Sequence, residues 1–327
     1  MIPRILIVAG SDSGGGAGIQ ADIKTVTMLG GHAMTAITAL TAQNTTGVQG
    51  VMPVPADFVV RQMRSCIDDI GVDAVKIGMI GSAETAHAVA DVLEGLLSSP
   101  SPSGEGSGVG EISPRPSLAA FPTPTPPLKG RGFSVPVVFD PVMISTSGSV
   151  LADADTIAAF DRLMRLATLV TPNLPELEAL VESLFPVRPE RVEGLLFSSD
   201  AEKNSASTGS ARTGEYLARA TGAALLVKGG HGEGDTLTDR LVTADGEIAH
   251  WSNPRIDTRH THGTGCTLAS AIATGLGAGL PLVDAIERGI AFVRAALAHA
   301  PGLGAGHGPM GHALGLAPFD SLKNRDA

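Results

Sequence analysis

The 327-residue sequence is poor in aromatic residues, which make up 3% of the chain and include one tryptophan and one tyrosine. Its core must therefore be built mainly from alanine, valine, isoleucine and leucine. The two cysteines, Cys66 and Cys266, are too few for a disulfide framework or a cysteine-based zinc site. The 41 glycines indicate many tight turns and close backbone approaches.

The sequence also lacks clustered basic residues and long apolar runs. Its 23 lysines and arginines are outnumbered by 33 acidic residues, which gives a formal charge of −10 without a local basic run. A nucleic-acid-binding face needs such a cluster, so nucleic acid is not an expected partner. The apolar part of residues 1–13 is too short for a signal sequence or a membrane span. We therefore expect a cytoplasmic protein with no membrane partner.

Short apolar runs alternate with segments of helical spacing along most of the chain. The runs are typical of strands buried on both faces, and Asp245-Gly246 suits a hairpin turn. This alternation predicts an α/β fold with a central, mostly parallel sheet and helices on both faces. The predicted strands cover 5–9, 34–42, 74–78, 135–139, 168–171 and 225–228, with a hairpin over 240–251; the predicted helices cover 19–29, 57–70, 82–97, 155–167, 174–181, 264–277 and 282–300.

Two segments, 98–134 and 185–214, break the pattern because they are rich in proline, serine and glycine or lack periodicity. Such composition buries too little apolar area to offset chain entropy, so we predict that both are disordered. Each falls where a short connection is usual. We interpret them as insertions into one domain spanning 1–327; the alternative is two domains divided near residue 115.

The glycine-rich segment 10–18 follows a predicted strand and opens a predicted helix, where backbone N–H groups can hold an anion or a polar ligand. It is not a Walker A loop, because no Gly-Lys-Ser/Thr follows. Gly16, Gly18 and Ala21 match a relaxed dinucleotide fingerprint, but residues 37–51 lack the acidic residue that this fingerprint requires. The segment by itself indicates only a ligand near this turn.

Residues 261–267 (THGTGCT) precede another predicted helix. Gly263 and Gly265 allow close backbone approach, and the free N–H groups of the helix start can stabilise a phosphoryl group in transfer. Cys266 at this position is expected to have a lowered thiol pKa. The alternative is an ordinary glycine-rich helix start with a buried cysteine.

Three further polar positions follow predicted strands. Asn173 and Glu176 could hold hydrated Mg²⁺ with phosphate oxygens, although their spacing alone favours a helix capping box. Lys228 could reach a nucleotide phosphate or could simply be solvated. Gln43 presents a donor beside an acceptor, which matches the edge of a heteroaromatic amine, or it could belong to a polar turn.

Taken in chain order, these motifs closely resemble the hydroxymethylpyrimidine/phosphomethylpyrimidine kinases over nearly the whole chain, apart from the two low-complexity segments. The matching segments are AGSDSGGGAGIQADIKT (9–25), TALTAQNTTGVQ (38–49), VKIGMIGS (75–82), FDPVMISTSG (139–148), LVTPNLPELEAL (169–180), LLVKGGH (225–231), RHTHGTGCTLASAIA (259–273) and GAGHGPMGH (304–312).

This resemblance implies a ribokinase-like fold with substrate and ATP at the carboxyl edge of the sheet. It implies two successive ATP- and Mg²⁺-dependent phosphorylations of 4-amino-5-hydroxymethyl-2-methylpyrimidine in thiamine diphosphate synthesis, and a homodimer. The alternatives are a pyridoxal kinase and a catalytically impaired pyrimidine-binding paralogue.

The resemblance also assigns roles to individual residues. Gln43 matches the pyrimidine-binding glutamine, and Cys266 replaces the aspartate base of the sugar kinases. Asn173 and Glu176 match the Mg²⁺ and phosphate motif, with Glu176 acting on the metal through water. The other matched positions are Gly10, Asp22, Met79 and Val142 around the pyrimidine, Lys228 and Thr264 near the nucleotide phosphates, and Gly263 and Gly265 in the anion hole.

Overall fold

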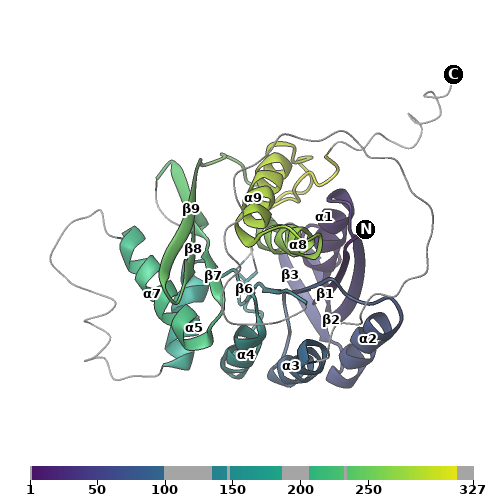
Figure 1. The fold of residues 1–327 in the computed structure, drawn as a ribbon. Helices are drawn as coiled ribbons and strands as arrows, with labels where there is room; N and C mark the ends of the chain where they lie inside the picture. The colour runs from purple at the N-terminus through teal and green to yellow at the C-terminus, as the bar shows by residue number, and fades with distance from the viewer. Residues whose placement is uncertain (1, 99–134, 146–147, 186–205, 232–233, 315–327) are drawn as a thin grey trace, which may run out of the picture.

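The computed structural model describes residues 2–98, 135–145, 148–185, 206–231 and 234–314 (Figure 1). Within these residues, nine strands form one sheet in the order β3-β2-β1-β4-β5-β6-β7-β8-β9. Neighbours from β2 to β7 pair in parallel, whereas β3, β8 and β9 pair antiparallel to their neighbours. The strands are β1 Arg4–Asp12, β2 His32–Asn44, β3 Gly47–Pro53, β4 Ala74–Ile77, β5 Val137–Phe139, β6 Leu169–Val170, β7 Ala224–Val227, β8 Thr236–Thr243 and β9 Gly246–Pro254.

Helices cover both faces of the sheet (Figure 1). Alternate strand residues enter two separate cores: Leu6 and Val8 pack with α2, α3, α4, α5 and α7, whereas Ile5 and Ile7 pack with α1, α8 and α9. This alternation follows from the two-residue period of a strand. The helices are α1 Gly18–Met28, α2 Ala56–Asp69, α3 Ala83–Ser98, α4 Ala154–Leu166, α5 Leu174–Leu184, α7 Ala206–Thr221, α8 Thr264–Gly277 and α9 Leu282–Ala298.

The predicted α/β class and the mostly parallel sheet are confirmed, and α8 has the predicted bounds. Two elements were not predicted. Strand β3 is exposed over most of its length, so its sequence carries no burial pattern. Helix α7 begins at Ala206, which corrects the prediction of disorder up to residue 214. Its apolar face is short, and Leu217 and Ala218 are buried only because they pack against the sheet. Residues 99–134 and 186–205 of the two segments lie outside the described residues.

The parallel strands bring their carboxyl ends to one edge of the sheet, and the loops that follow them carry most of the polar motif residues. The chain after β1 holds the glycine-rich loop, β5 is followed by Asp140, and β7 by Lys228. Such an edge is the usual ligand site of an open α/β sheet. Among the described residues, no helix is both long and apolar enough to cross a membrane.

Candidate active site

A cavity of about 790 Å³ lies at this edge, which is large enough for more than one small molecule. It receives side chains from the loops after β1, β4, β5, β6 and β7 and from the first turn of α8. The sequence-predicted residues that line it are Gly10, Gln43, Met79, Val142, Asn173, Glu176, Lys228, Gly263, Thr264, Gly265 and Cys266.

Asp22 is the exception, and its predicted place in the pyrimidine pocket is wrong. Its side chain is fully buried between α1, α8 and β4, where Lys76 Nζ lies 2.8 Å from Oδ2 and Ser270 Oγ donates to Oδ1 at 2.7 Å. Burial by itself would lower the pKa of Lys76, but the nearby acidic groups, with Asp22 first among them, together outweigh burial and raise that pKa. Asp22 therefore neutralises a buried cation instead of facing the cavity.

The start of α8 is shaped by glycine. Gly263, the N-cap of α8, has a φ of 88°, and a Cβ there would lie 2.0 Å from the Gly16 carbonyl oxygen. A Cβ on Gly265 would lie 3.1 Å from Asp140 Oδ2 and 3.4 Å from Lys228 Nζ. The two glycines thus let the first turn of α8 approach both the glycine-rich loop and a charged cluster.

That charged cluster consists of Lys228, Asp140 and Glu176. Lys228 Nζ donates to Asp140 Oδ1 at 2.9 Å and lies 3.8 Å from Glu176 Oε2, and Thr171 Oγ1 donates to Asp140 at 3.0 Å. Burial favours a neutral lysine, but the two carboxylates outweigh it and raise the pKa of Lys228. Lys228 is therefore a cation at neutral pH, placed beside the start of α8. The sequence reasoning missed Asp140, although its place directly after a buried strand marked it.

Asn173 and Glu176 form the capping box that their spacing favoured, and they line the cavity as well. Asn173 Oδ1 accepts from the Glu176 amide at 2.9 Å, and Glu176 Oε2 accepts from the Asn173 amide at 2.8 Å. Burial is the main reason that the pKa of Glu176 is raised. The capping and cavity-lining interpretations are thus compatible.

Cys266 lines the cavity, but the expected fall in its pKa is wrong. Burial raises the pKa of the thiol to about 11, and the carboxylates of Asp22 and Asp140 add to this rise. The Lys76 ammonium and a backbone hydrogen bond with Gly18 oppose it without cancelling it. Neighbouring protein groups and two nearby carboxylates therefore outweigh the local effect of the helix terminus on the thiol.

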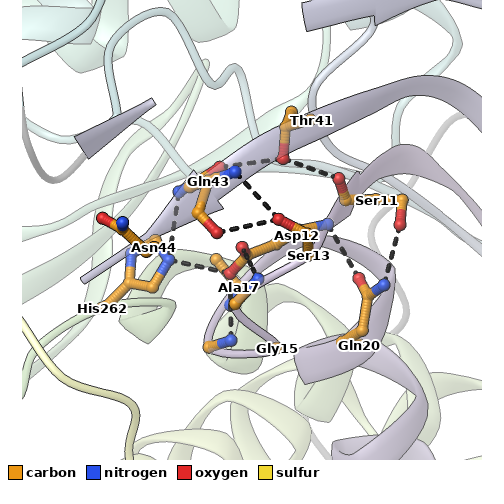
Figure 2. A network of polar contacts seen from close by, with 12 residues as sticks. Ser11, Asp12, Ser13, Gly15, Ala17, Gln20, Thr41, Gln43, Asn44 and His262 are labelled. Carbon is orange, nitrogen blue, oxygen red and sulfur yellow. Dashed lines mark hydrogen bonds and ion pairs between the residues drawn. The ribbon is translucent and has the colours of Figure 1, made fainter. Parts of the chain in front are cut away.

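Gln43 belongs to a polar network with the glycine-rich loop and His262 (Figure 2). Asp12 accepts hydrogen bonds from the amides of Gly14, Gly16 and Ala17 at 2.8–2.9 Å. His262 Nε2 lies 2.9 Å from Asp12 Oδ2. Burial opposes ionisation of Asp12, but these hydrogen bonds and His262 outweigh it, and the pKa of Asp12 is lowered.

The anion held by this loop is therefore the chain's own Asp12 carboxylate, which removes the basis for a dinucleotide site in the loop. Sequence reasoning missed both Asp12 and His262 as site residues. Their positions carried a signal, since each directly adjoins a glycine-rich motif that follows a strand or precedes a helix.

Comparison with known proteins gives one consistent family. The family model described as phosphomethylpyrimidine kinase matches residues 12–100 and 128–311. The hydroxymethylpyrimidine/phosphomethylpyrimidine kinase of Streptomyces coelicolor is 38% identical over 96% of this chain and 96% of that protein. The chain spans only 35% of another relative, the thiamine biosynthesis multifunctional protein ThiED of Corynebacterium efficiens, to which it is 37% identical.

Solved structures agree with this result. Phosphomethylpyrimidine kinase from Clostridium difficile is 28% identical, with a TM-score of 0.62 over 90% of this chain and 99% of that one. Pyridoxal kinase from Bacillus subtilis, solved as an ADP complex, is 25% identical, with a TM-score of 0.69 over 96% and 98% of the two chains. The fold is thus that of the ribokinase-like kinases, and the chain belongs to the phosphomethylpyrimidine kinase family.

Proposed function

We propose that this chain transfers the γ-phosphoryl group of ATP to the hydroxymethyl group of 4-amino-5-hydroxymethyl-2-methylpyrimidine. A second transfer to the monophosphate then gives the diphosphate for thiamine diphosphate synthesis. The observation that carries the proposal is that Gln43 and the first turn of α8 face one cavity in a chain of this family. A ring-binding amide and a phosphoryl-stabilising helix start are the two parts that this reaction needs.

In this mechanism Gln43 binds the pyrimidine ring so that its hydroxyl faces the γ-phosphate. Cys266 accepts the hydroxyl proton, and the amides of Gly265 and Cys266 stabilise the transferring group. Lys228 offsets the negative charge of the phosphates. Gly10, Met79 and the backbone of Val142 complete the pyrimidine pocket.

The residues of the charged cluster fit a magnesium ion that accompanies ATP. Mg²⁺ in kinases is held by one or two carboxylates together with waters and phosphate oxygens, and it neutralises phosphate charge. Asp140 and Glu176 offer carboxylates to the cavity beside Lys228. Among the described residues, no group of three or more His, Cys, Asp or Glu side chains could hold a metal ion.

Replacing Gln43 by alanine should raise KM for the pyrimidine strongly. Two hydrogen bonds to the ring are lost, which corresponds to a rise of about tenfold to a hundredfold, with a smaller change in KM for ATP. Steady-state kinetics with each substrate varied in turn measures this. Gln49→Ala, on the exposed strand β3 outside the cavity, is the matched control. An unchanged pyrimidine KM in Gln43→Ala would exclude the ring-binding role.

Replacing Asp140 by asparagine should lower kcat by about a hundredfold or more, because a carboxylate beside Lys228 and the proposed metal becomes neutral. Raising the Mg²⁺ concentration should recover part of the loss. A titration of activity against Mg²⁺ tests both statements. Asp91→Asn, in an exposed ion pair with Arg162, is the control. Wild-type turnover with the ordinary Mg²⁺ requirement in Asp140→Asn would contradict this assignment.

Pyridoxal kinase is the second candidate, because the pyridoxal kinase of Bacillus subtilis shares the fold over nearly the whole chain. Parallel assays of ATP consumption with the pyrimidine alcohol and with pyridoxal separate the two. We expect higher kcat/KM with the pyrimidine. A preference for pyridoxal would favour the second candidate, and ligand binding without turnover would indicate an impaired paralogue.

Three broader proposals accompany the reaction. One domain carries both substrate sites, since all described strands join one sheet. A homodimer follows from the family resemblance and is tested by sedimentation equilibrium. The cytoplasmic location rests on the composition of the chain and is tested by cell fractionation.

A further inference from the structure

The side-chain amide of Gln43 lies between two fixed polar atoms (Figure 2). Thr41 Oγ1 lies 3.2 Å from one of its terminal atoms, and His262 Nε2 lies 3.2 Å from the other. The Gln43 backbone is held as well, because its N–H donates to Ser13 Oγ and its carbonyl accepts from that hydroxyl, each at 2.8 Å. What remains to be assigned is which of the two terminal atoms of the Gln43 side-chain amide is the oxygen and which is the nitrogen.

The contact with His262 requires the oxygen on that side. His262 Nε2 lies 2.9 Å from Asp12 Oδ2, which also accepts from two loop amides. An ionised carboxylate can only accept, so Nε2 carries a hydrogen in either charge state of the ring. An amide NH₂ facing this N–H would bring two donors together, whereas an amide oxygen at 3.2 Å can share the N–H with Asp12 in a three-centre hydrogen bond.

The contact with Thr41 requires the nitrogen on the other side. Thr41 Oγ1 lies 2.9 Å from the carbonyl oxygen of Ser11, which can only accept, so the single hydroxyl hydrogen points there. The hydroxyl then offers Gln43 only lone pairs, and an amide N–H satisfies them. Two independent contacts therefore give the same orientation, obtained by exchanging the oxygen and nitrogen drawn in Figure 2.

We propose that His262, held by Asp12, is a positioning residue that fixes the Gln43 amide and thereby selects which way round the aminopyrimidine binds. This inference rests on the proposed function. With its outer bonds to Thr41 and His262 made, the amide presents one N–H and one oxygen lone pair to the cavity. The ring nitrogen accepts from that N–H, on the Thr41 side, and the 4-amino group donates to the oxygen, on the His262 side.

The orientation decides where the reacting group lies. The hydroxymethyl carbon is attached next to the amino-bearing carbon of the ring, so both substituents lie on the His262 side. His262 directly precedes Gly263, so this orientation brings the hydroxyl toward the first turn of α8. A reversed amide would bind the ring turned over, with its hydroxymethyl group on the side of Thr41.

The test compares the aminopyrimidine with its 4-oxo analogue, whose lactam form has the opposite order of donor and acceptor. The wild-type protein should prefer the amino ring by about a hundredfold or more in kcat/KM, because in the productive orientation the oxo ring leaves both polar contacts unmade. Turned over, the oxo ring makes both contacts but carries its hydroxymethyl group on the side of Thr41, away from the first turn of α8. In His262→Leu the amide can turn, so this preference should fall by about tenfold or more, and KM for the oxo ring should drop below its wild-type value. His262→Gln, whose terminal N–H can occupy the place of Nε2, should retain the preference.

Thr41→Val removes the other fixed contact and should reduce the preference for the amino ring in the same way, whereas Thr41→Ser should keep that preference. If His262→Leu does not fold, the two Thr41 variants test whether the fixed amide selects the ring orientation. A general structural role predicts equal losses for both rings. If both His262→Leu and Thr41→Val retain the wild-type preference, the positioning role is wrong while the proposed function stands. A wild-type protein that phosphorylates neither ring overturns the proposed function and this inference together.

Discussion

Replacing Cys266 by alanine should lower kcat by about a hundredfold to ten-thousandfold, the usual contribution of a general base. The affinity for the pyrimidine should change little, because Gln43 and not Cys266 binds the ring. Cys266→Ser should be similarly slow, since a hydroxyl is a far weaker base than a thiolate. Single-turnover kinetics and a direct measurement of pyrimidine binding separate the two effects. Cys66→Ala, on α2 and outside the cavity, should keep wild-type rates.

The raised pKa of Cys266 adds a pH dependence with a definite sign. At neutral pH the thiol is mostly protonated, because its pKa of about 11 lies above the ordinary value of 9.0. The fraction of thiolate therefore grows by about tenfold for each pH unit below that pKa. We expect log(kcat/KM) of the wild type to rise between neutral and alkaline pH, and this rise to disappear in Cys266→Ala. Near-normal turnover by Cys266→Ala would refute the base assignment.

Replacing Lys76 by methionine should destabilise the protein by about 3–5 kcal/mol, the usual result of removing one partner of a buried ion pair. Lys76 and Asp22 are both fully buried, so the variant leaves the Asp22 carboxylate without its cation. The melting temperature should fall by about 4–7 °C. Lys76→Met combined with Asp22→Leu should recover much of this loss, because it removes both charges. Thermal unfolding followed by circular dichroism measures all three proteins.

Three further results distinguish this explanation from ordinary packing damage. In Lys76→Met the deficit should shrink as pH falls, because protonation neutralises the isolated Asp22. In the wild type the raised pKa of Lys76 means that the stabilisation from the charged lysine is complete below its ordinary value of 10.5 and is lost as pH rises past its pKa in the folded protein. Burial raises the pKa of Asp22, so this carboxylate opposes part of that stabilisation at neutral pH. Arg61→Met, which breaks an exposed pair with Asp57, should cost less than about 1 kcal/mol. An equal, small change in the two variants would contradict the account of the buried pair.

The sequence predicted most of the elements that hold the site, because apolar runs and helix starts are local signals. Gly263 and Gly265 illustrate this, since their spacing before an alanine-rich segment predicted a helix start with close backbone approach, which the structure has. The pairing of distant charges was not predictable in this way. Asp22 meets Lys76 across 54 positions and His262 meets Asp12 across 250, so the role of each depends on the assembled sheet.

The two errors at the site have a common physical cause. A helix start lowers a thiol pKa locally, but Cys266 is governed by burial and by carboxylates from α1 and from the segment after β5. The family resemblance implied a ligand contact for Asp22, but that side of α1 faces Ser270 and Lys76. Strand β3 was not predicted because most of its residues are exposed, so its sequence shows no alternation of apolar and polar residues.

Product analysis tests the central claim most directly. The protein is incubated with 4-amino-5-hydroxymethyl-2-methylpyrimidine, ATP and Mg²⁺, and the products are followed by mass spectrometry over time. Our account predicts that a monophosphate appears first and is then converted to a diphosphate, with one ATP consumed at each step. Absence of phosphorylated pyrimidine, with a folded protein that still binds the ring, would contradict it.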